Sequence, residues 1–146
     1  MARRKILSRI AIPVALVSCG FLPVRAEAQT SGAGVIVYLD PMTTAGVGGT
    51  VNLAPRGEET NLQVTLNPGE ESEGGSDAYR MQVVEGSCST PGRVVEGLGE
   101  VHADGKTTRQ QGTLRLSDVR NGDHVIQVAD KQHKKVVACG LIPARD

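Results

Sequence analysis

The sequence predicts an all-β domain, a Greek-key antiparallel β-sandwich or barrel of about seven to eight short strands. Apolar and polar residues alternate with a period of two over several short runs, which is typical of half-buried strands. No stretch shows a sustained helical period. The runs are separated by Gly, Pro, Asn and Asp, and the 18 glycines fit the many turns that such a fold requires.

The expected strands follow one another with short connections. The clearest alternation places Leu62, Val64 and Leu66 on one face of a strand and polar residues on the other. Asn121-Gly122 predicts a hairpin turn between the two runs that flank it, whereas residues 88–99 are expected to be irregular. The expected strands cover 34–40, 48–55, 60–66, 79–86, 113–119, 123–130 and 134–143.

Residues 1–28 are expected to be a cleaved signal peptide. A basic start, MARRK, precedes a mostly apolar run, and Ala26 and Ala28 supply the small residues that signal peptidase recognises. This predicts a spacer at 29–33 and one β-domain over 34–146. A buried core helix and a retained transmembrane anchor are the alternatives, and the second is disfavoured because an arginine interrupts the short apolar run.

A second processing signal overlaps the first. LVSC, which ends at Cys19, resembles the lipobox of bacterial lipoproteins, so Cys19 is a candidate lipidation site. The apolar residues after Cys19 are unusual for a lipobox, and this favours cleavage after Ala28. We expect a periplasmic or secreted protein that meets a membrane only if Cys19 anchors it.

Cys88 and Cys139 remain as a pair whichever signal is used. A pair of cysteines in an oxidising compartment predicts a disulfide. The bond would close a loop of about 50 residues and contribute on the order of 4 kcal/mol. Two buried free thiols are the alternative. A zinc site is disfavoured because no histidine lies at ligand spacing from either cysteine.

Composition excludes some classes of function. Five of the 16 basic residues and one of the 16 acidic residues lie in the leader, so the remainder carries 11 basic and 15 acidic residues. This mild acidity argues against nucleic-acid binding, which requires a basic face. Beyond the leader the aromatic residues are Tyr38 and Tyr79, which is too few to predict stacking platforms.

No arrangement of residues predicts catalysis or a cofactor. The three histidines, His102, His124 and His133, are expected to face solvent, and a shared metal site would need converging ligands. Ser87 has neither a nearby histidine nor a glycine elbow. The acidic loop 67–77 lacks the alternating pattern of a calcium loop and is expected to be solvated, with weak calcium binding as the alternative.

Several segments resemble copper/zinc superoxide dismutases, and the small exported bacterial members most closely. The resemblance covers most of residues 47–143 and implies a superoxide-dismutase-like Greek-key fold. It also implies that Cys139, on the last strand, bonds to Cys88, in the loop after a ligand strand. The segments that carry it are VVEGSC (83–88), LGEVHADG (98–105), NGDHVIQVAD (121–130) and ACGLI (138–142).

The metal ligands of that family do not carry over. Valine, alanine and glycine cannot ligate a metal through their side chains, and glutamine offers only a weak amide oxygen, whereas copper cycling needs several converging imidazoles. The resemblance places copper histidines on Gln82, Val84 and Ala129, the zinc aspartate on Gly97, a zinc histidine near Val94 and the substrate-guiding arginine on Val136.

We therefore expect a non-catalytic binding or envelope-structural module with an unidentified envelope or extracellular partner. One alternative is a copper/zinc-binding, superoxide-dismutase-like metalloprotein that uses unconventional ligands, but it rests on fold analogy alone. Another is a matrix or adhesive β-sandwich that acts through an exposed sheet edge.

Overall fold

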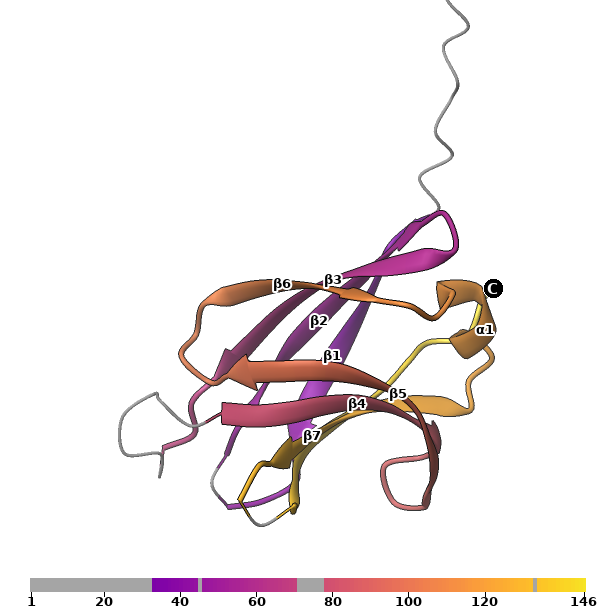
Figure 1. The fold of residues 1–146 in the computed structure, drawn as a ribbon. Coiled ribbons are helices and arrows are strands. Elements are labelled where there is room, and N and C mark those ends of the chain that lie inside the picture. The colour runs from indigo at the N-terminus through magenta and orange to yellow at the C-terminus, as the bar shows by residue number, and fades with distance from the viewer. Residues whose placement is uncertain (1–32, 45, 71–77, 133) are drawn as a thin grey trace, which may run out of the picture.

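The fold is an eight-stranded antiparallel barrel with one short helix (Figure 1). The structure, a computed structural model, describes residues 33–44, 46–70, 78–132 and 134–146. The predicted fold class is confirmed. The elements are β1 (Val35–Pro41), β2 (Gly48–Arg56), β3 (Glu59–Asn67), β4 (Ala78–Gly86), β5 (Pro91–His102), β6 (Thr107–Gly112), α1 (Leu116–Val119), β7 (His124–Asp130) and β8 (Val136–Leu141).

Six expected strands lie where the alternation placed them, and they are β1 to β4, β7 and β8. The expectation that 88–99 is irregular is wrong, because β5 begins at Pro91. Gly97 and Gly99 interrupt the alternation in the sequence, and the pairing of β5 with β4 contains register shifts that absorb them. Strand β6 was not expected, because its sequence, TTRQQG, contains no apolar residue.

The expected strand at 113–119 is also wrong. The chain forms the single turn of α1 there, and Leu116 and Val119 are both buried at a spacing of three residues. Asn121-Gly122 consequently joins α1 to β7 instead of connecting two strands, so the predicted hairpin is wrong as well. The Asn121 side chain still stabilises a turn, since its Oδ1 accepts a 3.0 Å hydrogen bond from the Asp123 amide.

The strands form one antiparallel order, β5-β4-β7-β8-β1-β2-β3-β6. The connection through α1 crosses from β6, at one end of this order, to β7, near the other end. The pairing of β1 with β8 is short, with Asp40 opposite Cys139 and Pro41 opposite Ala138. This short pairing joins β2, β3 and β6 on one side to β7, β4 and β5 on the other.

Gly140 allows this junction to form. A Cβ atom at Gly140 would lie 2.2 Å from the carbonyl oxygen of Tyr38, and it would also press on the Val37 side chain. The obstacle is backbone, which cannot rotate away as a side chain can. Any larger residue at this position would push β8 away from β1.

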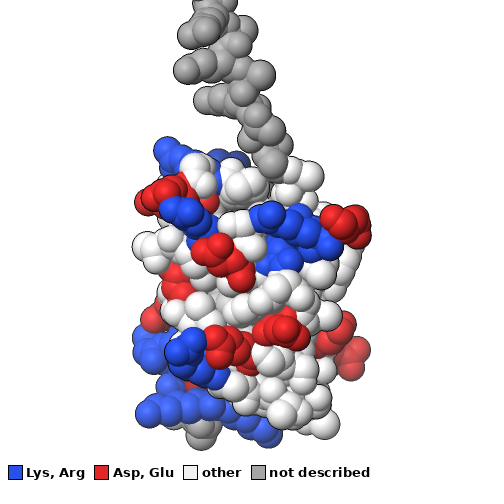
Figure 2. Space-filling model, turned by 90° about the vertical axis from the view of Figure 1, so that its right-hand side faces the viewer, with Lys and Arg blue, Asp and Glu red and all other residues white. Residues whose placement is uncertain are grey.

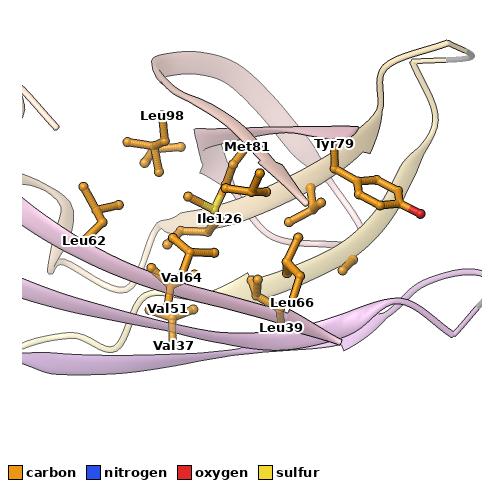
Figure 3. Packing of buried hydrophobic residues seen from close by; sticks show 14 of the residues in the cluster. Val37, Leu39, Val51, Leu62, Val64, Leu66, Tyr79, Met81, Leu98 and Ile126 are labelled. Atoms are coloured by element: carbon orange, nitrogen blue, oxygen red, sulfur yellow. The ribbon is translucent and has the colours of Figure 1, made fainter. Parts of the chain in front are cut away.

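The inward-facing residues of the strands form one core (Figure 3). Alternation places Leu62, Val64 and Leu66 of β3 in this core, as predicted, opposite Met81 of β4 and Ile126 of β7. Leu116 and Val119 of α1 cover one end of the barrel. Each fully buried aliphatic side chain contributes about 1.5–3 kcal/mol relative to its exposed state.

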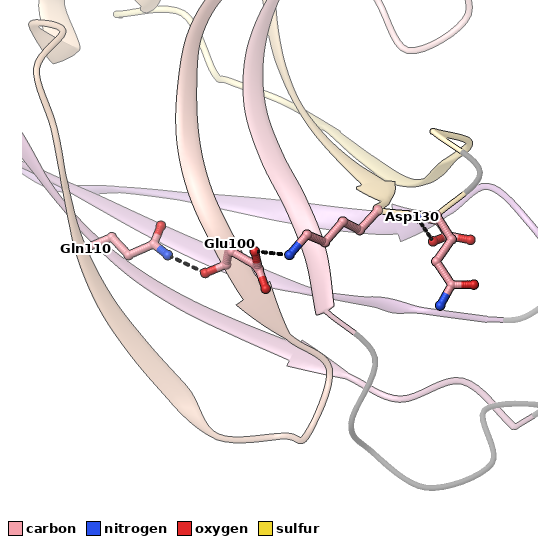
Figure 4. A network of polar contacts seen from close by, with 5 residues as sticks. Glu100, Gln110 and Asp130 are labelled. Atoms are coloured by element: carbon pink, nitrogen blue, oxygen red, sulfur yellow. Dashed lines mark hydrogen bonds and ion pairs between the residues drawn. The ribbon is translucent and has the colours of Figure 1, made fainter.

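Side chains close the seam between the terminal strands β5 and β6. The Glu96 carboxylate of β5 accepts hydrogen bonds from the amide and hydroxyl of Thr113, at 2.6 and 2.5 Å, and from the Leu114 amide at 3.1 Å. Further along, Gln110 Nε2 donates a 2.8 Å hydrogen bond to the Glu100 carbonyl (Figure 4). These contacts satisfy polar groups on strand edges that would otherwise remain open.

We predict that Gly140→Ala lowers the free energy of unfolding by roughly 3 kcal/mol, because the added methyl overlaps backbone. Gly97→Ala is the matched control, since a Cβ there meets no atom within 4 Å. Urea unfolding of both variants measures the difference. Equal stability of the two variants would show that β8 and β1 do not approach this closely.

We predict that Glu96→Gln costs about 1–2 kcal/mol, because the carboxamide keeps only one acceptor oxygen and turns an NH2 group toward donors of Thr113 or Leu114. Glu100→Gln is the control on the same strand. It removes only the exposed ion pair with Lys131, and we expect a change within about 0.5 kcal/mol. Denaturant unfolding would contradict this account of the seam if the two substitutions proved equally mild.

Candidate functional site

Four of the positions that the resemblance assigns to lost metal ligands lie on neighbouring strands of one wall. Gln82 and Val84 are on β4. Val83, which lies between them, and Met81, which precedes Gln82, point into the core. Gln82 is therefore on the outer face of the barrel, where it lies opposite Gly97 of β5 and Gln127 of β7. Ala129 lies opposite Arg80, one position along the same outer face.

Val84 belongs to a small apolar cluster on this outer face. It packs with Val125 of β7 and Cys139 of β8, and the partly buried Cys88 packs against them. Val84 and Val125 are almost completely buried although they point away from the barrel core. Apolar side chains thus occupy the space where a metal centre would need imidazoles, and this cluster has no group that can coordinate a metal.

The predicted disulfide between Cys88 and Cys139 covers this cluster and is confirmed. The two Cα atoms are 5.8 Å apart, and the bond links residues 51 positions apart. Ser87 makes two hydrogen bonds with the backbone of Thr90. Its amide donates to the Thr90 carbonyl, and its hydroxyl accepts from the Thr90 amide. The disulfide therefore holds the short, ordered connection between β4 and β5 against β8.

Amide groups occupy the polar part of the wall. Gln82 Nε2 donates a 3.4 Å hydrogen bond to Gln127 Oε1, and the Gln127 side chain is buried. A pair of neutral amides joined by this hydrogen bond neither transfers protons at neutral pH nor replaces imidazole as a copper ligand. Gly97, the position matched to a zinc aspartate, has no atom within 4 Å of where a Cβ would lie.

The two histidines that the structure describes, His102 and His124, lie at opposite ends of β4 and do not converge. His124 was expected to face solvent, but it is 8 % exposed at the end of the barrel, with Nδ1 2.8 Å from Asn121 Oδ1. His102 is exposed at the end of β5, and His133 lies outside the described residues. Among the residues that the structure describes, no group of three or more His, Cys, Asp or Glu side chains could hold a metal ion.

One carboxylate has a shifted pKa. Lys131 Nζ donates a 2.7 Å hydrogen bond to Glu100 Oε2, and this contact lowers the pKa of Glu100 below its usual value (Figure 4). The pair is exposed, so it is screened by solvent and contributes little to stability. The lowered pKa identifies a surface ion pair and gives no indication of acid–base catalysis.

A hollow near α1 is lined by Arg115, Arg120 and Arg145, and it also touches Ala33, the first described residue. Arg115 pairs with Glu58, while the Arg120 guanidinium donates to the carbonyls of Pro143 and Ala144. Figure 2 shows positive and negative side chains interleaved over the surrounding face. Arg115 and Arg120 therefore make local contacts, and the hollow is not surrounded by positive charge alone.

The remaining candidates add no site. Ser87, the candidate nucleophile next to Cys88, has its hydroxyl 3.1 Å from Ser89 Oγ, and this hydroxyl accepts a hydrogen bond from the Thr90 amide. Most of the acidic loop 67–77 and all of residues 1–28, including Cys19, lie outside the described residues. No helix in the described ranges is long and apolar enough to cross a membrane.

The chain matches no protein-family model, no curated protein and no solved structure at a significant level, so no family is identified. The structure therefore establishes a disulfide-bonded antiparallel barrel. The disulfide is consistent with an oxidising compartment.

We predict that replacing both cysteines, by Cys88→Ala with Cys139→Ala, lowers the free energy of unfolding by about 2–4 kcal/mol, because the unfolded chain loses a long cross-link. Ser87→Ala with Ser89→Ala is the control for changing the same connection without breaking the bond. Denaturant unfolding under oxidising conditions measures both. A double-cysteine variant as stable as this control would mean that the bond does not support the wall.

Proposed function

We propose that this chain is an exported, superoxide-dismutase-like module that has lost its copper and zinc ligands and acts by binding or as part of the cell envelope. The observation that carries the proposal is the outer wall of β4, β7 and β8. Its ligand positions hold Gln82, Val84 and Ala129, and the valine is packed beneath a disulfide.

The arrangement of the disulfide supports the superoxide-dismutase-like part of the proposal. The resemblance pairs a cysteine of the last strand with one in the segment after the ligand strand, and here Cys139 of β8 bonds to Cys88 after β4. The antiparallel barrel fits the same expectation. Only residues 131–135 connect β7 to β8, and this connection is long in the dismutases that the sequence resembles.

The leader supports the exported part of the proposal. A basic start, an apolar run and small residues at Ala26 and Ala28 occur in the order of a signal peptide. A disulfide is most useful to a protein that works outside the cytoplasm. Under this proposal the module is periplasmic or secreted, and lipidation of Cys19 would hold it at the envelope.

The chemistry of the wall supports a non-catalytic role. Dismutation of superoxide requires a redox-active metal held by several oriented imidazoles. Valine methyls and a hydrogen-bonded pair of amides offer no such ligands. Under the proposal, what the fold retains is a rigid barrel that presents its outer surfaces to a partner.

We predict that the processed protein carries far less than one copper or zinc ion per chain and has no superoxide-dismutase activity. The full-length chain should be expressed with its own leader in a bacterium, and the product recovered from the periplasm and dialysed. Elemental analysis and a superoxide assay then follow, with an active copper/zinc dismutase treated identically. Stoichiometric metal together with turnover would overturn the proposal, and His102→Ala and His124→Ala would then test unconventional ligands.

A further inference from the structure

The outer face of β1, β2, β3 and β6 forms a second wall, distinct from the wall that carries the disulfide (Figure 1). The strand registers align its outward side chains in three rows, two of which cross all four strands and one of which crosses β2, β3 and β6. A row of four residues spans three strand spacings, about 14 Å. The rows are Tyr38–Thr50–Thr65–Thr107, Ile36–Asn52–Gln63–Arg109 and Ala54–Asn61–Gln111.

These rows are almost uncharged. Within these described positions Arg109 alone carries a charge, although charged residues make up 22 % of the chain. The carboxylate of Asp40 and the opposed pair Arg56 and Glu59 lie at the ends of the strands, beyond the rows. An ordinary solvated face carries charged side chains of both signs. Hydroxyl and amide groups take their place here, and each can both donate and accept a hydrogen bond.

Tyr38 adds an exposed aromatic ring to the first row. Its side chain is 67 % exposed, whereas Tyr79, the other described aromatic residue, is buried in the core. Tyrosine offers a rigid apolar surface with a polar end, and ordering it on binding costs little conformational entropy. The sequence has few aromatic residues, and the fold presents this one at the edge of a neutral polar wall.

A shallow groove lies over the paired segments of β3 and β6. It is lined by Asn61, Gln63, Arg109 and Gln111, with Gln110 beneath them. The Oε1 atom of Gln110 is buried and accepts no hydrogen bond, although its Nε2 donates to the Glu100 carbonyl. This side chain turns away from the groove toward the seam with β5, because Gln110 lies between the outward-facing Arg109 and Gln111. The polar groups that the groove presents are therefore those of Asn61, Gln63, Arg109 and Gln111.

We infer that this wall binds a neutral polysaccharide. Sugar hydroxyls donate and accept hydrogen bonds as the amides and threonines of the wall do, and the apolar face of a sugar ring matches the exposed ring of Tyr38. We expect a ligand without net charge because the three rows have a single charged side chain, Arg109, to pair with it. The inference rests on the proposed binding role and names its surface and its ligand class.

The test is retention of the processed protein on insoluble cellulose, chitin and starch, with dextran sulfate as an anionic comparison. Saturable binding to at least one neutral polymer is expected, and 0.5 M salt should leave it unchanged because screening does not weaken neutral contacts. Tyr38→Ala should weaken binding roughly tenfold through the lost ring contact. Gln63→Ala should weaken it roughly three- to tenfold through lost hydrogen bonds.

The controls lie away from the wall. Gln82→Ala removes an amide from the disulfide wall, and Leu141→Ala removes an exposed apolar side chain from β8, so both should bind as the unaltered protein does. Thermal unfolding of every variant confirms folding before binding is compared. Tyr38→Phe, which keeps the ring, should retain most of the affinity.

Three outcomes would overturn the inference: no retention on any neutral polymer, retention that Tyr38→Ala and Gln63→Ala leave intact, or retention on dextran sulfate alone that salt abolishes. Copper and zinc are measured on the same protein batch. Metal-free protein that ignores neutral polymers refutes the polysaccharide site and leaves the non-catalytic module standing. Protein with stoichiometric metal and superoxide turnover refutes the module itself.

Discussion

The close approach of β8 to β1 is the constraint on which the rest of the structure depends. Gly140 has room for no side chain because the carbonyl of Tyr38 lies where its Cβ would be. The neighbouring residue, Cys139, pairs with Asp40 and also carries the disulfide to Cys88. Two adjacent residues of β8 thus join the two halves of the barrel and attach the connection after β4. Moving β8 outward would weaken the strand pairing and displace the apolar cluster of Val84 and Val125 together.

The sequence predicted the strands whose apolar residues alternate without interruption. It missed β5, whose alternation Gly97 and Gly99 interrupt, and β6, which has no apolar side chain. Alternation located β3 because Leu62, Val64 and Leu66 all face the core. Strand β6 turns Gln110 toward the seam, where the amide bonds to the carbonyl of Glu100, so its stabilisation comes from a partner that no local pattern reveals. The burial of His124 depends likewise on the closing of the barrel end. Counting cysteines sufficed for the disulfide because only two lie beyond residues 1–28, which were expected to be a cleaved leader.

The candidate site was predictable as a set of substitutions but not as a packed surface. The resemblance placed Gln82, Val84 and Ala129 at lost ligand positions, and the structure brings them to one wall. The resemblance did not indicate that Val125 and the disulfide would cover Val84. An apolar cluster fills this space and contributes stability of its own, whereas a metal centre there would have left polar ligands dependent on the ion. The fold needs no ion to hold this wall together.

The most direct test of this account is the thermal unfolding midpoint of the purified, disulfide-bonded protein in the presence of a chelator and in the presence of excess copper and zinc. Anything that binds the native state more tightly than the unfolded state raises the midpoint. The account predicts the same midpoint in all conditions, because the β1–β8 junction, the Glu96 contacts and the disulfide hold the barrel without an ion. A midpoint that falls with chelator, or that rises clearly with either metal, would contradict it.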